Sequence, residues 1–269
     1  MTLVIPRRLK AFQGVSAENT ATVQITGGPT YHQLVFWSNI PPAKMPRVYL
    51  TLNGIDIISV KAADLVMLGK FRKRYETQYR YVLYLADKVN LSLESRSISA
   101  LVTFPTDLLT LSIDLGDALP GGAYIKGKAE VSASQQARVF VPLKYRTNYD
   151  ASATAENNFD TFQRGPAIQR LHFESANISR LMVYKDKLLV WDRDADENIA
   201  SLKEDDRAPQ PGWFHFDAIQ SDFGIADLFQ TKDVRESLEF KFDISAVANV
   251  PILVEALKQE PPQTSQQVL

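Results

Sequence analysis

The sequence predicts an all-β protein of two similar β units in tandem, with one short helix in each unit. Strand-like segments with alternating apolar residues, or with β-branched and aromatic enrichment, run through most of the 269 residues. Residues 47–83 align without a gap on residues 180–216, at a constant offset of 133 positions. A helix-like stretch follows the aligned strands in each half, from Ala62 and from Glu197. Many short strands with turn residues between them are typical of β sandwiches and barrels.

The internal repeat extends beyond the gapless alignment. At this offset RVYLTLNGIDIISV lies over RLMVYKDKLLVWDR, and YVLYL lies over FHFDA. An earlier pair, QLVFWSNI and RLHFESANI, and a later pair, LTLSIDL and LEFKFDI, match in the same order with small gaps. Shared strand alternation explains any one pair, but three pairs in one order indicate duplication of a whole β unit.

The expected elements of the first half begin with strands that glycine and proline turns separate. These strands are TATVQIT, HQLVFW, RVYLTL, IDIISV, YRYVLYL, ALVTF, LLTLSIDL, AYIKGKAEV and ARVFVPL. Asn53-Gly54 lies between two of them and predicts a tight hairpin, because both turn residues must accept positive φ. The helical stretch AADLVMLGKFRKRY places Leu65, Leu68 and Phe71 near one face.

The second half repeats this order. Its expected strands are IQRLHFE, RLMVY, KLLVW, GWFHFDAI, SLEFKFDI and PILVEAL, and its helix is ENIASLKEDD. Asp186-Lys187 is the weaker counterpart of the Asn53-Gly54 turn. A polar stretch, TNYDASATAENNFDTF, follows Arg146 and holds few apolar anchors. We therefore expect one domain over residues 1–146 with an N-terminal arm, and a second over residues 147–269 with a disordered or arm-like tail.

Charge is unevenly distributed between the halves. Residues 1–135 carry 15 Lys and Arg against 10 Asp and Glu, whereas residues 136–269 carry 15 against 21. Opposite charges on two similar domains suit a head-to-tail ring, in which the first domain of one subunit meets the second domain of the next. Chance drift after duplication explains the asymmetry equally well. The charge implies no contact with nucleic acid.

Signals of catalysis are missing from the sequence. There is no cysteine, which excludes disulfides, thiol catalysis and zinc–thiolate sites. The three histidines, His32, His172 and His215, lie in strand-like runs beside apolar neighbours and are interpreted as structural. No nucleophile elbow, phosphate-binding loop or zinc-protease motif occurs. The apolar run in the opening MTLVIPRRLKAF is too short for a signal peptide or a membrane span.

One acidic segment has the spacing of a metal site. Asp192, Asp194 and Asp196 alternate in WDRDADENIASLKEDD, and alternate carboxylates in a tight loop can converge on calcium. The segment is no EF-hand, because its sixth residue is Glu197 and not glycine. The alternative is an acidic helix start, in which first-turn carboxylates favour the helix dipole.

Two basic segments are candidate contact surfaces. Arg7, Arg8 and Lys10 follow the apolar stretch LVI and form a short amphipathic arm. Such an arm can lie on an anionic membrane or pack under a neighbouring subunit, and an ordinary frayed terminus is the alternative. The run KFRKR from Lys70 can meet phosphate or lipid, although such a run is more often a solvated helix face.

The whole chain resembles the major capsid protein of a corticovirus, a tailless icosahedral phage with an internal membrane. The resemblance rests on length, on the tandem β units, on the helix after each repeated strand pair and on the opening MTLVIPRRLKAF. It implies two tandem eight-stranded jelly rolls, in a double jelly roll with a short helix in each. It also implies homotrimers of pseudo-hexagonal outline that tile an icosahedral shell over an internal lipid membrane. The family has no short signature motif.

The resemblance further implies partners and a place in the virus. The partners are other copies of the chain, the internal membrane with its proteins, and a vertex or spike protein. The chain would occupy the virion capsid, and the host cytoplasm before assembly. No cofactor is required, although shells of this kind are associated with calcium. No metal ligand carries over by motif, so Asp192, Asp194 and Asp196 stay a hypothesis from spacing.

We therefore predict a structural protein that is not an enzyme. The alternative is a calcium-dependent carbohydrate-binding pair of β sandwiches, with Trp191 and Tyr184 near the acidic segment. A duplicated β-scaffold enzyme such as a bicupin is a third class. Bicupins need histidine-rich metal sites, and three scattered histidines argue against one.

Overall fold

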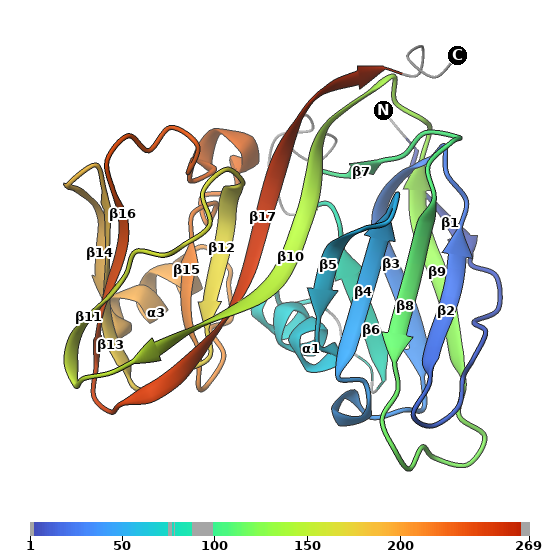
Figure 1. Cartoon of the computed structure of the whole chain (residues 1–269), viewed down its shortest axis with the longest axis horizontal. Coiled ribbons are helices and arrows are strands. Elements are labelled where there is room, and N and C mark those ends of the chain that lie inside the picture. Colours follow the sequence, from blue (N-terminus) through green and yellow to red (C-terminus); the bar gives the residue numbers. More distant parts are fainter. Residues whose placement is uncertain (1–2, 75–76, 78, 88–98, 265–269) are drawn as a thin grey trace.

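Two β sandwiches lie side by side in the computed structural model, which describes residues 3–74, 77, 79–87 and 99–264 (Figure 1). The first sandwich, roll 1, holds α1 (Ala62–Phe71) and the short 3-10 helix Pro42–Lys44. Its strands are β1 (Ile5–Arg8), β2 (Thr20–Ile25), β3 (Thr30–Ser38), β4 (Arg47–Leu52), β5 (Ile55–Val60), β6 (Arg80–Tyr84), β7 (Leu101–Val102), β8 (Leu109–Asp114) and β9 (Ile125–Ser132).

The second sandwich, roll 2, holds α3 (Ala195–Glu204) and the 3-10 helix Gly224–Asp227. Its strands are β10 (Ala137–Ala151), β11 (Ala155–Phe159), β12 (Ala167–Phe173), β13 (Ile178–Lys185), β14 (Leu188–Asp194), β15 (Phe214–Asp217), β16 (Leu238–Ile244) and β17 (Ala248–Thr264). The predicted helices are both present, one in each roll, and each follows the repeated strand pair.

The two rolls share one topology. In roll 1 the sheets run β1-β9-β3-β6 and β2-β8-β4-β5, with the short β7 beside β3. In roll 2 the corresponding orders are β10-β17-β12-β15 and β11-β16-β13-β14. Each strand of one order therefore has an equivalent in the other. The prediction of two tandem eight-stranded jelly rolls with a short helix in each is confirmed.

Alternation along the strands builds one large core cluster centred in each roll, and the cluster of roll 1 also takes in Leu202 and Leu253 of roll 2. Leu34 and Phe36 of β3 are fully buried between the sheets of roll 1. Leu171 and Phe173 of β12 are fully buried in the same way in roll 2. The residues between them point to the outer face of their sheet, because successive strand side chains alternate.

The tight hairpin predicted at Asn53-Gly54 joins β4 to β5. Asn53 has φ of 50° and Gly54 has φ of 84°. Its counterpart in roll 2 adopts the same left-handed conformation without glycine, with φ of 51° at Asp186 and 68° at Lys187. Asp186 compensates by accepting hydrogen bonds from the backbone N–H groups of residues 235 and 236, at 2.9 and 2.7 Å.

The join between the rolls differs from the expected division after Arg146. That residue lies inside the continuous strand β10, which pairs along its length with β17. The topology places all of β10 in roll 2, so the rolls meet in the connection between residues 132 and 137. In the polar stretch after Arg146, residues 147–151 pair with β17 and residues 155–159 pair with β16, and β17 continues past Gln259 as far as Thr264. The tail was expected to be disordered or arm-like, and its described part is a strand.

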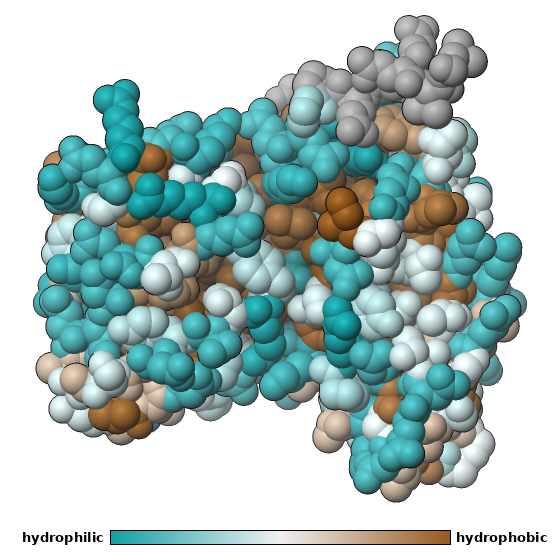
Figure 2. Space-filling view, viewed as in Figure 1, coloured by the Kyte–Doolittle hydropathy of each residue, from teal (hydrophilic) through white to brown (hydrophobic). Residues whose placement is uncertain are grey.

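A parallel contact fuses the rolls. Lys144 and Tyr145 of β10 pair with Ile58 and Ser59 of β5, which creates one eight-stranded sheet across the molecule. In Figure 1 the long pair of β10 and β17 crosses between the rolls, with α1 beside it. Figure 2 shows hydrophilic and neutral side chains over most of the same face, with apolar ones gathered mainly between the rolls.

Candidate subunit-contact sites and the buried junction

The acidic segment turns from β14 into α3. Asp192 lies on β14 and forms a two-point ion pair with Arg180 of β13, at 2.7 and 2.5 Å. Asp194 is the N-cap of α3, where its carboxylate accepts the Glu197 backbone N–H at 2.8 Å. The Glu197 side chain accepts the Asp194 N–H in return, at 3.4 Å, and Asp196 is exposed in the first turn. The three aspartates thus have three different surroundings.

This arrangement confirms the acidic helix start that was the alternative to a metal site. Asp194 and Glu197 form a capping box, which satisfies orphan N–H groups of the first turn. Within the described ranges, no group of three or more His, Cys, Asp or Glu side chains is placed to hold a metal ion. Calcium binding by Asp192, Asp194 and Asp196 stays a prediction.

The N-terminal arm forms an edge strand. β1 pairs antiparallel with β9 through residues 5–8, and the backbone N–H of Leu9 donates to Gly127. Arg7, Arg8 and Lys10 are exposed. Among the described residues, neither Arg7 nor Arg8 has a carboxylate ion-pair partner. The strand places these cations on the surface of roll 1 with their charge available to a partner.

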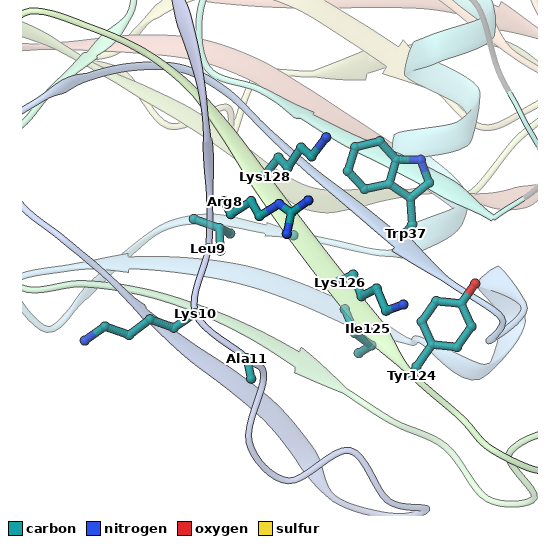
Figure 3. A pocket seen from close by; sticks show the side chains of 10 residues that line it. Arg8, Leu9, Lys10, Ala11, Trp37, Tyr124, Ile125, Lys126 and Lys128 are labelled. Carbon is teal, nitrogen blue, oxygen red and sulfur yellow. The ribbon is translucent and has the colours of Figure 1, made fainter.

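A basic groove runs beside this strand (Figure 3). It has a volume of about 820 Å³ and contains four cationic and two aromatic side chains. Lys128 lies 5.6 Å from the centre of the Trp37 ring, and Lys126 lies 5.1 Å from that of Tyr124. None of the described residues that line the groove is acidic. The groove therefore suits an anionic partner.

The opposite edge of the molecule is apolar. Leu188, Leu189 and Val190 of β14 are 69 %, 50 % and 48 % exposed. β14 is the last strand of its sheet among the described residues, so its outer backbone groups have no neighbouring strand there. An exposed apolar edge strand is a template for pairing with another chain.

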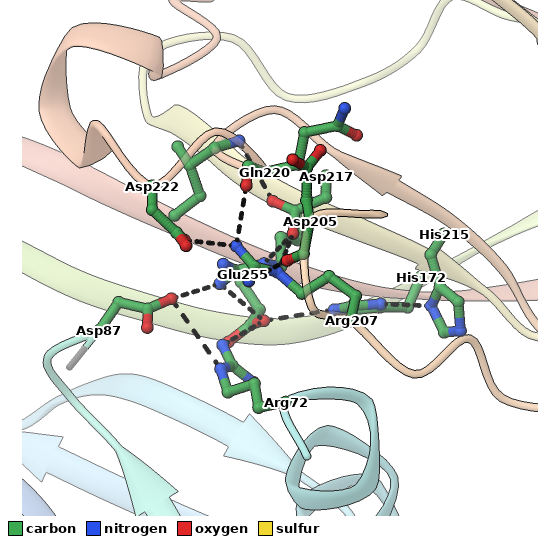
Figure 4. Close-up of polar contacts among 12 residues, drawn as sticks. Arg72, Asp87, His172, Asp205, Arg207, His215, Asp217, Gln220, Asp222 and Glu255 are labelled. Atoms are coloured by element: carbon green, nitrogen blue, oxygen red, sulfur yellow. Dashed lines mark hydrogen bonds and ion pairs between the residues drawn. The ribbon is translucent and has the colours of Figure 1, made fainter. Parts of the chain in front are cut away.

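A buried ionic cluster fills the junction between the rolls (Figure 4). At its centre is Glu255 of β17, which is completely buried. Arg72, at the end of α1 in roll 1, reaches across to Glu255 at 2.7 Å. Lys144 of β10 forms a second ion pair with the same carboxylate. Two cations from different rolls thus share one acid.

Arg170 extends the cluster on the outer face of β12. It contacts Asp87 of roll 1 at 2.7 Å and Asp217 of β15 at 2.9 Å. Arg207 contacts the same Asp217 at 3.0 Å and continues to Asp222 at 2.5 Å. Buried charges are tolerated only when they are paired in this way.

Two histidines complete the cluster as a hydrogen-bond chain. The Gln210 backbone N–H donates to Nε2 of His215 at 3.1 Å, so the proton of His215 lies on Nδ1. That Nδ1–H donates to Nδ1 of His172 at 2.7 Å, and Nε2–H of His172 donates to Glu255 at 3.2 Å. His32 contacts Ser132 at 2.8 Å. The structural interpretation of all three histidines is confirmed.

Burial and pairing shift the pKa values in this cluster. Burial opposes ionisation of Glu255, but Arg72 and Lys144 more than offset it and hold the pKa of its carboxyl well below the usual value. Burial likewise opposes ionisation of Asp87, and Arg170 with Arg72 lowers its pKa overall. Burial lowers the pKa of His172 and, more strongly, that of His215. The histidines are therefore neutral and the carboxylates charged at neutral pH.

Most of this cluster was not predicted from the sequence. Arg72 belongs to the basic run interpreted as a solvated helix face, yet it is 6 % exposed. Its partners lie up to 183 positions away in the chain, and no local pattern marks such pairs. Arg170 and Glu255 are charged residues within strand segments that are otherwise largely apolar and buried. A charge in such a segment is the sequence signal that could have indicated a buried ion pair.

Comparison with known protein families matches both rolls. Residues 6–132 match the viral coat protein P2 N-terminal domain, and residues 141–260 match the viral coat protein P2 C-terminal domain. The chain belongs to the viral coat protein P2 family. It is a viral major capsid protein, a structural component of the virion and not an enzyme, as the sequence resemblance predicted.

Solved capsid structures share the fold of this coat protein. The major capsid protein P2 of bacteriophage PM2 superimposes with a TM-score of 0.88 at 16 % identity, over 96 % of this chain and 98 % of that chain. A chain of Sulfolobus Turreted Icosahedral Virus gives 0.69 at 12 % identity, over 95 % and 91 %. A chain of the PBCV-1 virus capsid gives 0.60 at 9 % identity, over 98 % and 97 %. Comparison with curated proteins found no match.

The family assignment favours the coat-protein prediction over the carbohydrate-binding alternative. It also gives the exposed edges a context, because a coat protein must associate with further copies of itself. No helix among the described residues has the length and apolar character needed to cross a membrane.

Proposed function

We propose that three copies of this coat protein form a trimer of pseudo-hexagonal outline, and that such trimers tile an icosahedral shell. The observation that carries the proposal is the duplication of one eight-stranded roll in one rigidly joined chain. Three copies supply six similar rolls, and six similar units fill a six-cornered position of a near-hexagonal lattice. The buried cluster supports the proposal, because it fixes the angle between the rolls.

We further propose that the shell encloses an internal lipid membrane and that a vertex or spike protein occupies its corners. Both follow from the resemblance to corticovirus capsid proteins. The coat protein would be free in the host cytoplasm before assembly. Exposed Lys10 provides positive charge that suits an anionic surface. Flotation of the assembled protein with anionic and neutral vesicles tests the membrane contact.

The solution mass of the purified protein tests the trimer. Static light scattering after size-exclusion chromatography should give three times the chain mass of 30.2 kDa. A monomer at every concentration up to the millimolar range would contradict the proposal. A dimer would contradict it equally, because two copies supply only four rolls.

Calcium is a separate proposal, tested by comparing thermal unfolding with and without millimolar calcium. Specific binding at the acidic segment predicts that calcium raises the melting temperature of the natural chain. It also predicts a smaller rise for the variant with Asp192, Asp194 and Asp196 all replaced by asparagine. If calcium does not raise the melting temperature of the natural chain, or raises that of both proteins equally, the proposed calcium site is contradicted.

A further inference from the structure

Two strands at the ends of the described sheets, β1 and β14, have no neighbour on their outer side. Because the rolls are duplicates, these two strands are equivalent to β10 and β5, which pair with each other within the chain. Within the chain, β5 of roll 1 is joined to β10 of roll 2. The equivalent of β5 in roll 2 is β14, and the equivalent of β10 in roll 1 is β1. Both β14 and β1 are the last strands of their sheets among the described residues.

The 133-residue offset identifies the residues of β14 that are equivalent to the contact residues of β5. Ile58 and Ser59 of β5 correspond to Trp191 and Asp192 of β14. The correspondence is structural as well as sequential, because β4–β5 and β13–β14 are the same hairpin and α1 and α3 follow them.

Strand pairing identifies the residues of β1 that are equivalent to the contact residues of β10. Tyr145 of β10 pairs with Val254, which pairs with the core residue Leu171. In roll 1, Arg7 of β1 pairs with Ala129, which pairs with Leu34.

Leu34 and Leu171 are themselves equivalent, since their partners Leu83 and Phe216 are 133 positions apart. Arg7 therefore corresponds to Tyr145, and the preceding Pro6 corresponds to Lys144.

We propose that β1 of one copy adds in parallel to β14 of the next copy, in the register by which β10 adds to β5 within the chain. The proposal rests on the trimer proposed above and deepens it by naming the contact that closes the ring. The internal register is Lys144 to Ile58 and Tyr145 to Ser59. Translated, it places Pro6 beside Trp191 and Arg7 beside Asp192.

This register brings apolar residues together. Continuing it backwards from Pro6 sets residues 3–5 beside residues 188–190. Leu3, Val4 and Ile5 are 77 %, 39 % and 45 % exposed, so both segments are apolar and open to solvent in the single chain. The contact would bury both exposed segments and pair both open edges.

The same register aligns opposite charges. Arg146 follows Tyr145 on β10 and makes a two-point ion pair with Asp64 in the first turn of α1. Arg8 corresponds to Arg146, and Glu197 in the first turn of α3 corresponds to Asp64 at the 133-residue offset. Both Arg8 and Glu197 are exposed in the single chain. In the proposed contact, Arg8 of one copy pairs with Glu197 of the next copy, just as Arg146 pairs with Asp64 within one chain.

Charge reversal with rescue tests the pairing. Arg8→Glu and Glu197→Arg should each raise the trimer dissociation constant about tenfold or more, and the double variant should recover most of the loss. Lys70→Glu is the matched control, because Lys70 is exposed on α1 and lies outside the proposed contact. It should leave the dissociation constant unchanged.

Cross-linking tests the register independently, and the natural chain contains no cysteine that would interfere. In the register, Ile5 lies beside Val190 of the next copy. A variant with Ile5→Cys and Val190→Cys, treated with a short thiol-specific cross-linker, should give covalent trimers in denaturing gels. The control pair of Ile5→Cys and Val247→Cys, with Val247 62 % exposed, should remain monomeric in the gel.

The outcomes separate this inference from the trimer itself. Cross-linked trimers together with rescue by the double charge reversal support it. If the natural chain is trimeric, but the Ile5→Cys and Val190→Cys variant gives no cross-linked trimers and Arg8→Glu does not weaken the trimer, the β1–β14 contact is overturned and the trimer stands. A monomeric natural chain overturns both.

Discussion

At the scale of single residues, Glu255 determines how the rolls are joined. It is the shared acid for Arg72 of roll 1 and Lys144 of roll 2, and all three side chains are buried. A buried charge that loses its partner keeps its desolvation cost, whereas an exposed one is stabilised by water. The cluster therefore makes the junction intolerant of change at Glu255 in particular.

Replacing Glu255 with glutamine should be strongly destabilising. The amide keeps the shape but leaves buried cations uncompensated, and we expect a loss of about 3–5 kcal/mol in the free energy of unfolding. Glu174→Gln is the control, because Glu174 pairs with Arg146 at the surface with 41 % of its side chain exposed. It should cost about 1 kcal/mol or less. Denaturant unfolding measures both, and equal losses would contradict the role of Glu255.

The same cluster predicts acid sensitivity. His172 and His215 have pKa values below 6.5 in the folded chain, so their contribution to stability is present above pH 6.5 and is lost as pH falls below it. Glu255 and Asp87 have lowered pKa values, so their contribution is lost at lower pH, below about 4.5. Melting temperature measured from pH 8 to pH 4 should fall in this order. His215→Gln should flatten the fall between pH 6.5 and 5, and an unchanged fall would contradict the assignment.

At the scale of elements, a repeated hairpin and a repeated helix determine where each sheet edge lies. The β4–β5 hairpin needs two residues at positive φ, and Asn53-Gly54 supplies them with little strain. In roll 2 the side chain of Asp186 supports the same turn through backbone hydrogen bonds. The edge strands β5 and β14 follow directly, so turn geometry places β5 at the joint between the rolls and β14 at the open edge that we propose meets the next copy.

Gly54→Ala should destabilise the chain by about 1 kcal/mol. The added methyl group meets nothing within 4 Å, so the cost is that of positive φ for a residue with a side chain. Gly121→Ala is a matched control, because its surroundings are equally open and its φ is not left-handed. The control should be neutral or slightly stabilising. Chemical denaturation measures the free energy of unfolding of both variants, and an equal loss at both positions would contradict the role of positive φ at Gly54.

These elements were largely predictable from the sequence, since strand alternation and the Asn-Gly turn are local signals and the 133-residue repeat is found by aligning the chain with itself. An acidic start to α3 was also visible as the alternative to a metal site, but the capping role of Asp194 was not predicted. The domain division was expected after Arg146 because the sequence becomes polar there, whereas β10 continues to Ala151 by pairing with β17. The buried cluster was missed because its pairs, such as Arg72 with Glu255, form only when two distant segments meet.

At the scale of the whole molecule, duplication produces two equivalent pairs of sheet edges, one pair already joined within the chain and one pair left without a neighbour among the described residues. The joined pair is β5 with β10 inside the chain, and the open pair is β14 with β1. The positive first half and the negative second half carry complementary charge to the two sides of the open contact. In the proposed ring of three copies, every such contact is closed.

An electron cryo-microscopy map of the oligomer, at a resolution that traces the chain, would show which strands meet between copies. We expect six similar rolls around a threefold axis, with β1 of each copy in parallel beside β14 of its neighbour and Arg7 opposite Asp192. A ring in which β14 faces solvent, or an oligomer joined through other surfaces, would contradict it.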